Sequence, residues 1–124
     1  MKTFKELGLS SDLLKALDKK GYTAPTEIQE KTTPLLLSGE IDIIGHSQTG
    51  SGKTAAFALP IIQNVDLNSN HIQALILVPT RELALQVSKE FESLSGNKRI
   101  YSMPVYGGTS IMDQLKQLKR GVHV

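Results

Sequence analysis

The chain has 124 residues, of which 40% are hydrophobic and 21% charged, and this composition is typical of a globular rather than a disordered protein. It contains no cysteine, which excludes disulfides, thiolate metal sites and cysteine nucleophiles. The formal charge is +2, but residues 1–95 carry nine basic and eleven acidic side chains and residues 96–124 carry five basic and one acidic. That basic end is either an electrostatic footprint for a polyanion or simply the solvated face of a helix.

No apolar run approaches the length of a membrane-spanning helix, and the N-terminus lacks the apolar segment of a signal peptide. We therefore expect a cytoplasmic protein with no membrane partner. The three histidines lie far apart without ligand spacing, which argues against a zinc site.

The first 40 residues predict two helices. Residues 10–20 begin with serines that can cap a helix and place three leucines on one side. After a turn, Thr26 and Gln29 have the spacing of a capping box, so we expect the second helix to begin there. Pro34 should kink or shorten this helix, which we expect to end near Ser38 and Gly39.

A short apolar run then leads into a glycine-rich loop and the start of a third helix, the context that a phosphate-binding loop requires. Gly50 and Gly52 let backbone N–H groups approach a phosphate chain, and the helix start adds the positive end of its dipole. Lys53 supplies a mobile charge, and Thr54 offers a hydroxyl to magnesium. The loop predicts a site for a nucleoside triphosphate with magnesium; the alternative is a Gly/Ser-rich turn beside an unrelated lysine.

The rest of the chain alternates apolar runs with helical patterns. Within the third helix, Pro60 predicts an end or a kink. Leu83, Val87, Phe91 and Leu94 have helical spacing in the fourth helix, which Thr80 can cap. In a fifth helix, capped by Ser110 with Asp113, we expect the buried residues to be Ile111, Leu115 and Leu118.

The apolar runs predict strands at 41–44, 74–78, 100–106 and 121–124. Strands that alternate with helices predict the α/β class, with a parallel sheet and flanking helices. Ligands of such sheets bind beyond the carboxyl ends of the strands, so the loops after the first three strands should form one working edge. We expect a helical region at 1–40 and a nucleotide-binding core at 41–124, together forming one structural unit.

Four sequence blocks together resemble the first RecA-like domain of DEAD-box RNA helicases. Gly21–Gln29 is similar to the family's Q motif, with Phe4 at the place of its upstream aromatic residue. Ser47–Thr54 is similar to motif I, with Ser in the first position, where Ala is usual in the family and Gly in the general P-loop pattern. Pro79–Leu83 resembles motif Ia, and Tyr106–Gly108 resembles the family's glycine doublet.

The resemblance implies a P-loop NTPase fold, ATP and magnesium as cofactors, and RNA bound through its backbone without sequence preference. The nucleotide-binding residues that it implies are Phe4, Tyr22, Thr26, Gln29, Ser47, Gln48, Thr49, Gly50, Ser51, Gly52, Lys53 and Thr54, of which Lys53 and Thr54 are also catalytic and Thr54 is the magnesium ligand. The RNA-binding residues that it implies are Pro79, Thr80, Arg81, Gly107 and Gly108.

Three of these roles have structural alternatives. The Gln29 amide can donate to and accept from adenine, but it can equally serve only as the capping partner of Thr26. Phe4 and Tyr22 would bound the base, or they belong to the core. Arg81 would contact phosphate or pair with a carboxylate such as Glu82.

The family's later motifs and its second RecA-like domain have no counterpart among these residues, so we expect a front fragment of an ATP-dependent RNA helicase. By itself the fragment is expected not to hydrolyse ATP. The alternatives are a module that binds nucleotide without turnover and a different P-loop enzyme, such as a small-molecule kinase.

Overall fold

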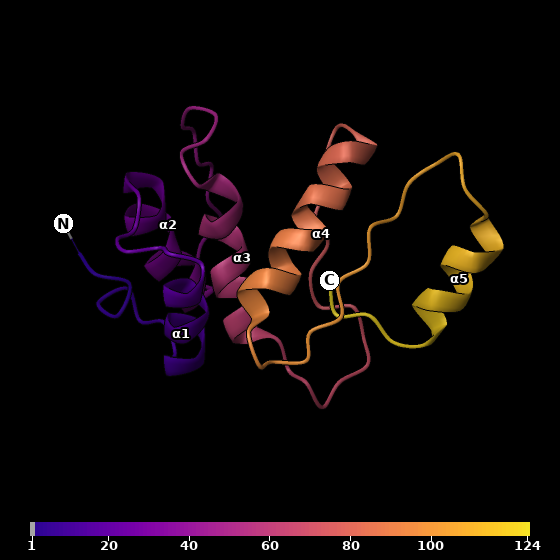
Figure 1. Cartoon of the computed structure of the whole chain (residues 1–124), viewed down its shortest axis with the longest axis horizontal. Helices are drawn as coiled ribbons and strands as arrows, with labels where there is room; N and C mark the ends of the chain where they lie inside the picture. The colour runs from indigo at the N-terminus through magenta and orange to yellow at the C-terminus, as the bar shows by residue number, and fades with distance from the viewer. Residues whose placement is uncertain (1) are drawn as a thin grey trace.

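The computed structural model describes residues 2–124 and contains five α-helices in that range. They are α1 (Ser11–Lys19), α2 (Glu27–Ser38), α3 (Lys53–Asn64), α4 (Arg81–Ser95) and α5 (Ile111–Lys119). Figure 1 shows α1 and α2 at one end of the molecule, α3 and α4 in the middle and α5 at the other end. None of the helices in this range is long and apolar enough to cross a membrane.

The predicted start and end of α2 are confirmed. Thr26 is the N-cap and forms a capping box with Gln29, as its spacing in the sequence indicated. Gly39 ends the helix in the left-handed conformation at φ 68°, which a glycine adopts without the steric cost of a side chain. Pro34 lies inside the helix, which continues to Ser38.

The helix expected over about residues 53–64 is confirmed as α3, but of the end or kink expected at Pro60 the end is wrong, because the helix continues to Asn64. Pro60 is buried, and α3 packs against both α2 and α4. A proline inside a helix removes one backbone hydrogen bond. Burial of the apolar face of α3 against two neighbours offsets that loss, so the packing keeps the helix continuous.

One hydrophobic core joins the regions 1–40 and 41–124. Side chains from α1 and the segment before it pack with those of α3 and α4, and the core residues with the least exposure include Leu7, Leu17, Leu59, Ile62, Phe91 and Leu94. The expected pattern on α4 is confirmed, since Val87, Phe91 and Leu94 are buried and Leu83 packs against the core. The N-terminal helices therefore fix α3 and α4, whose first turns carry the candidate site.

The structure does not confirm the predicted sheet, because residues 2–124 contain no assigned β-strand. Three extended segments nevertheless exchange backbone hydrogen bonds: the N–H of Val124 donates to Tyr101 O at 3.3 Å, and the N–H of Met103 donates to Val124 O at 3.0 Å. This reciprocal pattern of hydrogen bonds is the one found between two parallel β-strands. Gln73 N–H donates to His123 O at 2.8 Å and brings the third segment alongside.

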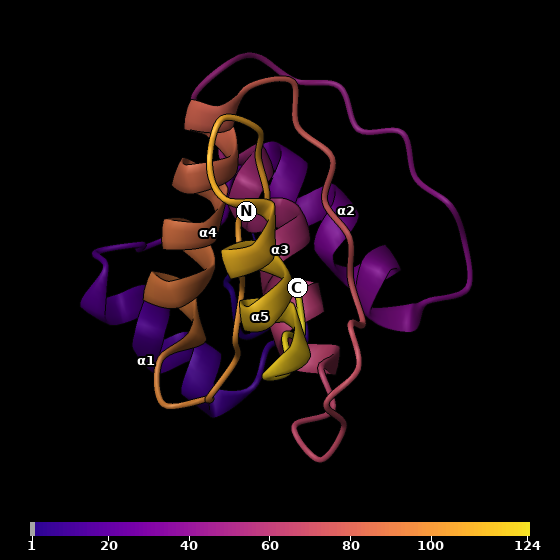
Figure 2. The same ribbon diagram turned by 90° about the vertical axis from the view of Figure 1, so that its right-hand side faces the viewer.

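The segment 41–46 takes part in none of these bonds, and Figure 2 shows the chain between α2 and α3 following an open path beside the helices. Ile44 is fully exposed and Leu77 is 87% exposed. Several apolar side chains of these two predicted strands are thus left in contact with solvent, whereas Ile76 and Val78 pack against the core.

The expectation that α5 buries an apolar face is also wrong. Ile111 is 71% exposed and Leu115 is 45% exposed, and α5 contains no buried residue. Figure 1 shows α5 standing apart from the other helices. Its Ser110 cap is present as predicted and accepts a hydrogen bond from the Asp113 N–H at 3.3 Å.

Candidate functional site

The glycine-rich loop lies where the sequence predicts it, at the N-terminus of α3. Gly50 and Gly52 adopt φ angles of 79° and 84°, in the left-handed region that favours glycine. Gly52 is the N-cap of α3. Within residues 2–124, the backbone N–H groups of Lys53 and Thr54 donate to no protein acceptor, as expected at the first turn of a helix. They therefore remain available to an anion at the positive end of the helix dipole.

Lys53 folds back over this loop. Its Nζ donates to Ser47 O at 2.5 Å and to Gln48 O at 2.9 Å. The loop is braced further by hydrogen bonds between the hydroxyls of Ser47 and Ser51 and from Ser51 Oγ to Gln48 O at 2.6 Å. The positive charge of Lys53 is thus held at the loop, where a phosphate group would exchange with the two carbonyl oxygens.

Gln29 lies against the same loop and is only 2% exposed. Its Oε1 accepts a hydrogen bond from the Thr26 N–H at 3.1 Å, and its Nε2 donates to Gly52 O at 3.1 Å. Gln29 therefore joins the start of α2 to the last residue before α3. A Cβ at Gly52 would lie 2.3 Å from Gln29 Nε2, so the close approach of the two residues requires a glycine.

Tyr22, in the turn before α2, is attached to α4. Its hydroxyl donates to Glu90 Oε1 at 3.1 Å, and Glu90 also pairs with Lys20 at 2.8 Å. Partial burial, and then the negative charge of Glu90, raise the pKa of Tyr22 above its usual value. The structure places Phe4 in the core at 6% exposure, away from the loop residues.

A cleft of about 820 Å³ connects several of the predicted residues. Tyr22 lines it together with Gly50, Gly52, Lys53 and Thr54, and the apolar walls come from α3, α4 and the segment 76–78. The predicted nucleotide-binding residues that do not line it are Phe4, Thr26, Gln29, Ser47, Gln48 and Ser51. The structure thus gathers Tyr22 and the second half of the loop around one cleft, whereas Gln29 contacts Gly52 outside the cleft lining and Phe4 lies in the core.

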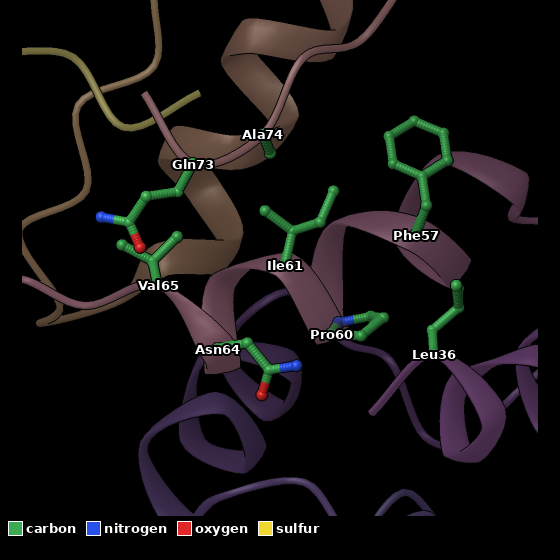
Figure 3. A pocket seen from close by; sticks show the side chains of 8 residues that line it. All are labelled: Leu36, Phe57, Pro60, Ile61, Asn64, Val65, Gln73 and Ala74. Atoms are coloured by element: carbon green, nitrogen blue, oxygen red, sulfur yellow. The ribbon is translucent and has the colours of Figure 1, made fainter. Parts of the chain in front are cut away.

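A second pocket, of about 250 Å³, adjoins the cleft along α3 and shares Leu36 and Phe57 with it (Figure 3). Figure 3 shows the side chains that line it, which come from α3, from Leu36 of α2, from Val65 and from the segment that begins at Gln73. No charged side chain lines this pocket, so it offers nothing to bind a triphosphate.

The start of α4 and the glycine doublet lie side by side. Thr80 is the N-cap of α4 and accepts a hydrogen bond from the Leu83 N–H at 3.1 Å. The Arg81 guanidinium lies over the Tyr106 ring, 4.5 Å from its centroid, so the predicted pair with Glu82 is replaced by a cation–π contact. Gly108 adopts a φ of 81° and approaches the Arg81 guanidinium. These RNA-binding candidates therefore form one surface.

Three side chains to which the sequence analysis gave no role of their own hold the candidate residues in place; of these, Tyr106 was named only as part of the glycine-doublet block. Glu90 anchors Tyr22, and Tyr106 supports Arg81. Gln114 of α5 braces the doublet loop: its Oε1 accepts from the Tyr106 N–H at 3.1 Å and its Nε2 donates to Tyr106 O at 3.0 Å. No sequence signal marks these contacts, because each joins side chains or backbone groups of different elements.

Comparison with known proteins identifies the family. The model of the family described as DEAD/DEAH box helicase matches residues 26–124. The DEAD-box ATP-dependent RNA helicase CshA of Geobacillus kaustophilus is 48% identical over 124 residues, which are all of this chain and 26% of that protein. The chain thus spans about a quarter of the length of this curated relative.

Solved structures agree with this result. The crystal structure of a DEAD box protein from Methanococcus jannaschii superposes with a TM-score of 0.93 at 49% identity, over 98% of this chain and 33% of that one. A Saccharomyces cerevisiae Dbp5 variant bound to RNA and ADP BeF3 superposes with a TM-score of 0.79 at 35% identity, over 90% of this chain and 30% of that one. The fold is thus that of a RecA-like P-loop NTPase domain of DEAD-box helicases, and the chain belongs to the DEAD/DEAH box helicase family.

Proposed function

We propose that this chain binds ATP with magnesium at the loop 47–54 and contributes to binding the RNA backbone in an ATP-dependent RNA helicase. The whole protein would couple ATP hydrolysis to the unwinding or remodelling of RNA, together with a second RecA-like domain. The observation that carries the proposal is the pair of left-handed glycines, Gly50 and Gly52, at the N-terminus of α3 with Lys53 folded over them. The relative named above as an ATP-dependent RNA helicase supports it.

The nucleotide would lie in the cleft beside the loop. The backbone amides at the start of α3 and Lys53 would hold the phosphates, with Ser47, Gln48, Thr49 and Ser51 shaping the loop around them. The half-buried Thr54 would supply one hydroxyl ligand to magnesium, which otherwise keeps its waters. Magnesium would supply charge neutralisation between the outer phosphates.

The base would lie towards Tyr22 and Gln29, with Thr26 fixing Gln29 through the capping box and Phe4 supporting this side from the core. The Gln29 amide keeps a second hydrogen and a second lone pair beyond the bonds to Gly52 and Thr26. Adenine presents an amino donor next to a ring-nitrogen acceptor, which these two groups match.

We also propose that the extended segments 41–44, 74–78, 100–106 and 121–124 are strands of one parallel sheet in the whole protein. The parallel hydrogen-bond pattern between 101–103 and 124 supports this arrangement. In it, the loop 47–54, the start of α4 and the glycine doublet follow successive strands and meet at one edge.

Replacing Gln29 by alanine is expected to weaken ATP binding more than GTP binding. The preference for ATP, expressed as the ratio of the two dissociation constants, should therefore become smaller. The expectation follows because adenine carries an amino donor at the position where guanine carries a carbonyl acceptor, so an amide placed to match adenine meets the wrong group on guanine. Calorimetric titration of the protein with ATP and with GTP, both in the presence of magnesium, measures the two dissociation constants. Thr26→Ala is the matched control, since it removes the hydroxyl half of the capping box and keeps both the Gln29 amide and the backbone N–H that donates to it.

If both affinities fell by the same factor in Gln29→Ala, Gln29 would serve only to position Gly52, and the base-recognition role would be wrong. The circular dichroism of each variant at 222 nm checks that α2 remains folded. This check is needed because each hydrogen bond that is lost lowers the free energy of unfolding by about 1 kcal/mol.

RNA binding is expected to be weak, indifferent to sequence and sensitive to salt, because Thr80, Arg81 and the glycine doublet offer groups that bind phosphate rather than read bases. With about two phosphates neutralised, the log–log slope of affinity against salt should be near −1.4 for single strands. Arg81→Gln should bring it to about −0.7. Fluorescence anisotropy with several unrelated single strands measures both values.

The control for that titration is Lys89→Gln, which removes one exposed charge from the same helix α4. Its slope should match that of the original chain. An equal change in both variants, or a strong preference for one RNA sequence, would contradict binding at Arg81.

A further inference from the structure

A separate polar pocket of about 440 Å³ lies away from the loop 47–54. It is enclosed by the loop before the segment 73–78, the turn after α4 and the end of α5, and the side chains that define its chemistry are Asn70, Asn97, Arg99, Tyr101, Arg120 and His123. None of these residues lines the cleft at the glycine-rich loop. The pocket is therefore distinct from the site already described.

The charge of this pocket is entirely positive. Arg99 and Arg120 line it and no carboxylate does, although Asp66 belongs to the neighbouring loop and there accepts from the Asn68 N–H at 2.9 Å. Within residues 2–124 neither arginine forms an ion pair or a side-chain hydrogen bond. Both arginines are exposed, and an anion between their guanidinium groups would be attracted by both, so the chemistry of the pocket suits a negatively charged ligand.

His123 forms the rigid floor of the pocket. The residue is 5% exposed, its backbone N–H donates to Tyr101 O at 2.8 Å, and its Nδ1 accepts from the Tyr101 N–H at 3.0 Å. Because Nδ1 is an acceptor, the neutral ring carries its hydrogen on Nε2. In the described part of the chain Nε2 donates to no protein atom, so this donor is available to a ligand in the pocket that the two arginines also line.

The remaining wall is an aromatic face. Tyr101 stacks on His123 with ring centroids 5.8 Å apart and an interplanar angle of 16°, yet it is 60% exposed. Asn70 packs against Gly121, whose φ of 100° turns the chain towards the pocket. The pocket thus combines guanidinium, amide and imidazole donors with an exposed ring on which a base can stack.

We propose that this pocket binds a phosphate group. Arginine forks match phosphate oxygens in pairs, and the amide and imidazole donors can satisfy the oxygens that remain. The phosphate belongs either to a single-stranded RNA, whose base would stack on Tyr101, or to free inorganic phosphate. The RNA source rests on the proposed function, whereas the inorganic source does not.

Nuclear magnetic resonance of the 124-residue chain labelled with nitrogen-15 tests the proposal, because it reports each site separately. Inorganic phosphate is expected to shift the side-chain N–H signals of Asn70, Asn97, Arg99 and Arg120. The double variant Arg99→Gln with Arg120→Gln should weaken these shifts by roughly tenfold or more in apparent Kd, since charge-assisted hydrogen bonds are lost.

The matched control is Lys116→Gln with Lys119→Gln, which removes the same two charges from exposed positions of α5 outside the pocket. Its apparent Kd should stay within about twofold of the original, as exposed charges act weakly at a distance. Absent shifts at the four side chains, or equal weakening in both double variants, would overturn the proposal.

A hexauridylate titration separates the two sources. If RNA supplies the phosphate, Tyr101→Ala should weaken hexauridylate binding at this pocket and leave inorganic phosphate binding unchanged. Equal binding of hexauridylate with and without the ring would overturn the RNA source.

Shifts of the Gly50 and Gly52 signals on adding ADP with magnesium report the glycine-rich loop independently. Failure at one site is therefore distinguishable from failure at the other.

Discussion

Replacing Gly52 with alanine is expected to destabilise the fold by about 2–5 kcal/mol and to weaken nucleotide binding with it. The left-handed φ of 84° costs a residue with a Cβ about 1–2 kcal/mol. The new Cβ would also lie 2.3 Å from Gln29 Nε2 and displace a buried hydrogen bond worth about 1–3 kcal/mol when left unmade. Urea unfolding followed by circular dichroism at 222 nm measures the change.

Gly50→Ala is the matched control, because Gly50 has a similar φ of 79° but nothing within 4 Å of its added Cβ. It should lose only the about 1–2 kcal/mol of backbone strain. The double variant Gly52→Ala with Gln29→Ala should recover part of the loss, since truncating Gln29 removes the collision. Equal destabilisation of the two glycine variants would mean that the contact with Gln29 does not restrict this position.

Lys53→Ala is expected to weaken ATP binding by roughly 10- to 150-fold, because it removes a charge-assisted phosphate contact worth about 1.5–3 kcal/mol. Without nucleotide, Lys53 already donates to Ser47 O and Gln48 O, so ATP must replace these bonds. The net effect should therefore lie towards the lower end of the range. Calorimetric titration with ATP and magnesium measures it.

The control for Lys53 is Lys89→Ala, which removes an exposed lysine from α4 without affecting the loop. Its ATP affinity should equal that of the original chain. An unchanged affinity in Lys53→Ala would remove the loop from the nucleotide site and the proposed function with it. Urea unfolding of the same variant shows how much stability the two carbonyl contacts contribute.

Local rules explain the parts of the fold that the sequence analysis predicted correctly. The caps at Thr26, Thr80 and Ser110 each involve a partner three residues away, so their spacing in the sequence suffices. The glycine-rich loop before a helix belongs to the same class, because the left-handed φ of Gly50 and Gly52 is a property of their own backbone, although the contact of Gly52 with Gln29 is not local. Each of these features was predictable because it depends on neighbours in the chain.

The spacing of apolar residues predicted burial less reliably. It identifies the apolar face of a helix but does not indicate whether another element packs against that face. Apolar side chains at helical spacing are buried on α4, but those on α5 are exposed, and Ile111 remains 71% exposed. Pro60 was misjudged for the converse reason: a local helix breaker was outweighed by packing against two other helices.

The sequence by itself determined the chemistry of the phosphate loop, the helix starts and the family resemblance, since these depend on residue type and short spacing. Only the tertiary structure decided which remote residues meet: Gln29 on Gly52, Tyr22 on Glu90, Arg81 on Tyr106 and His123 on Tyr101. These contacts join residues at least 22 positions apart, so the packing of whole elements sets their distances.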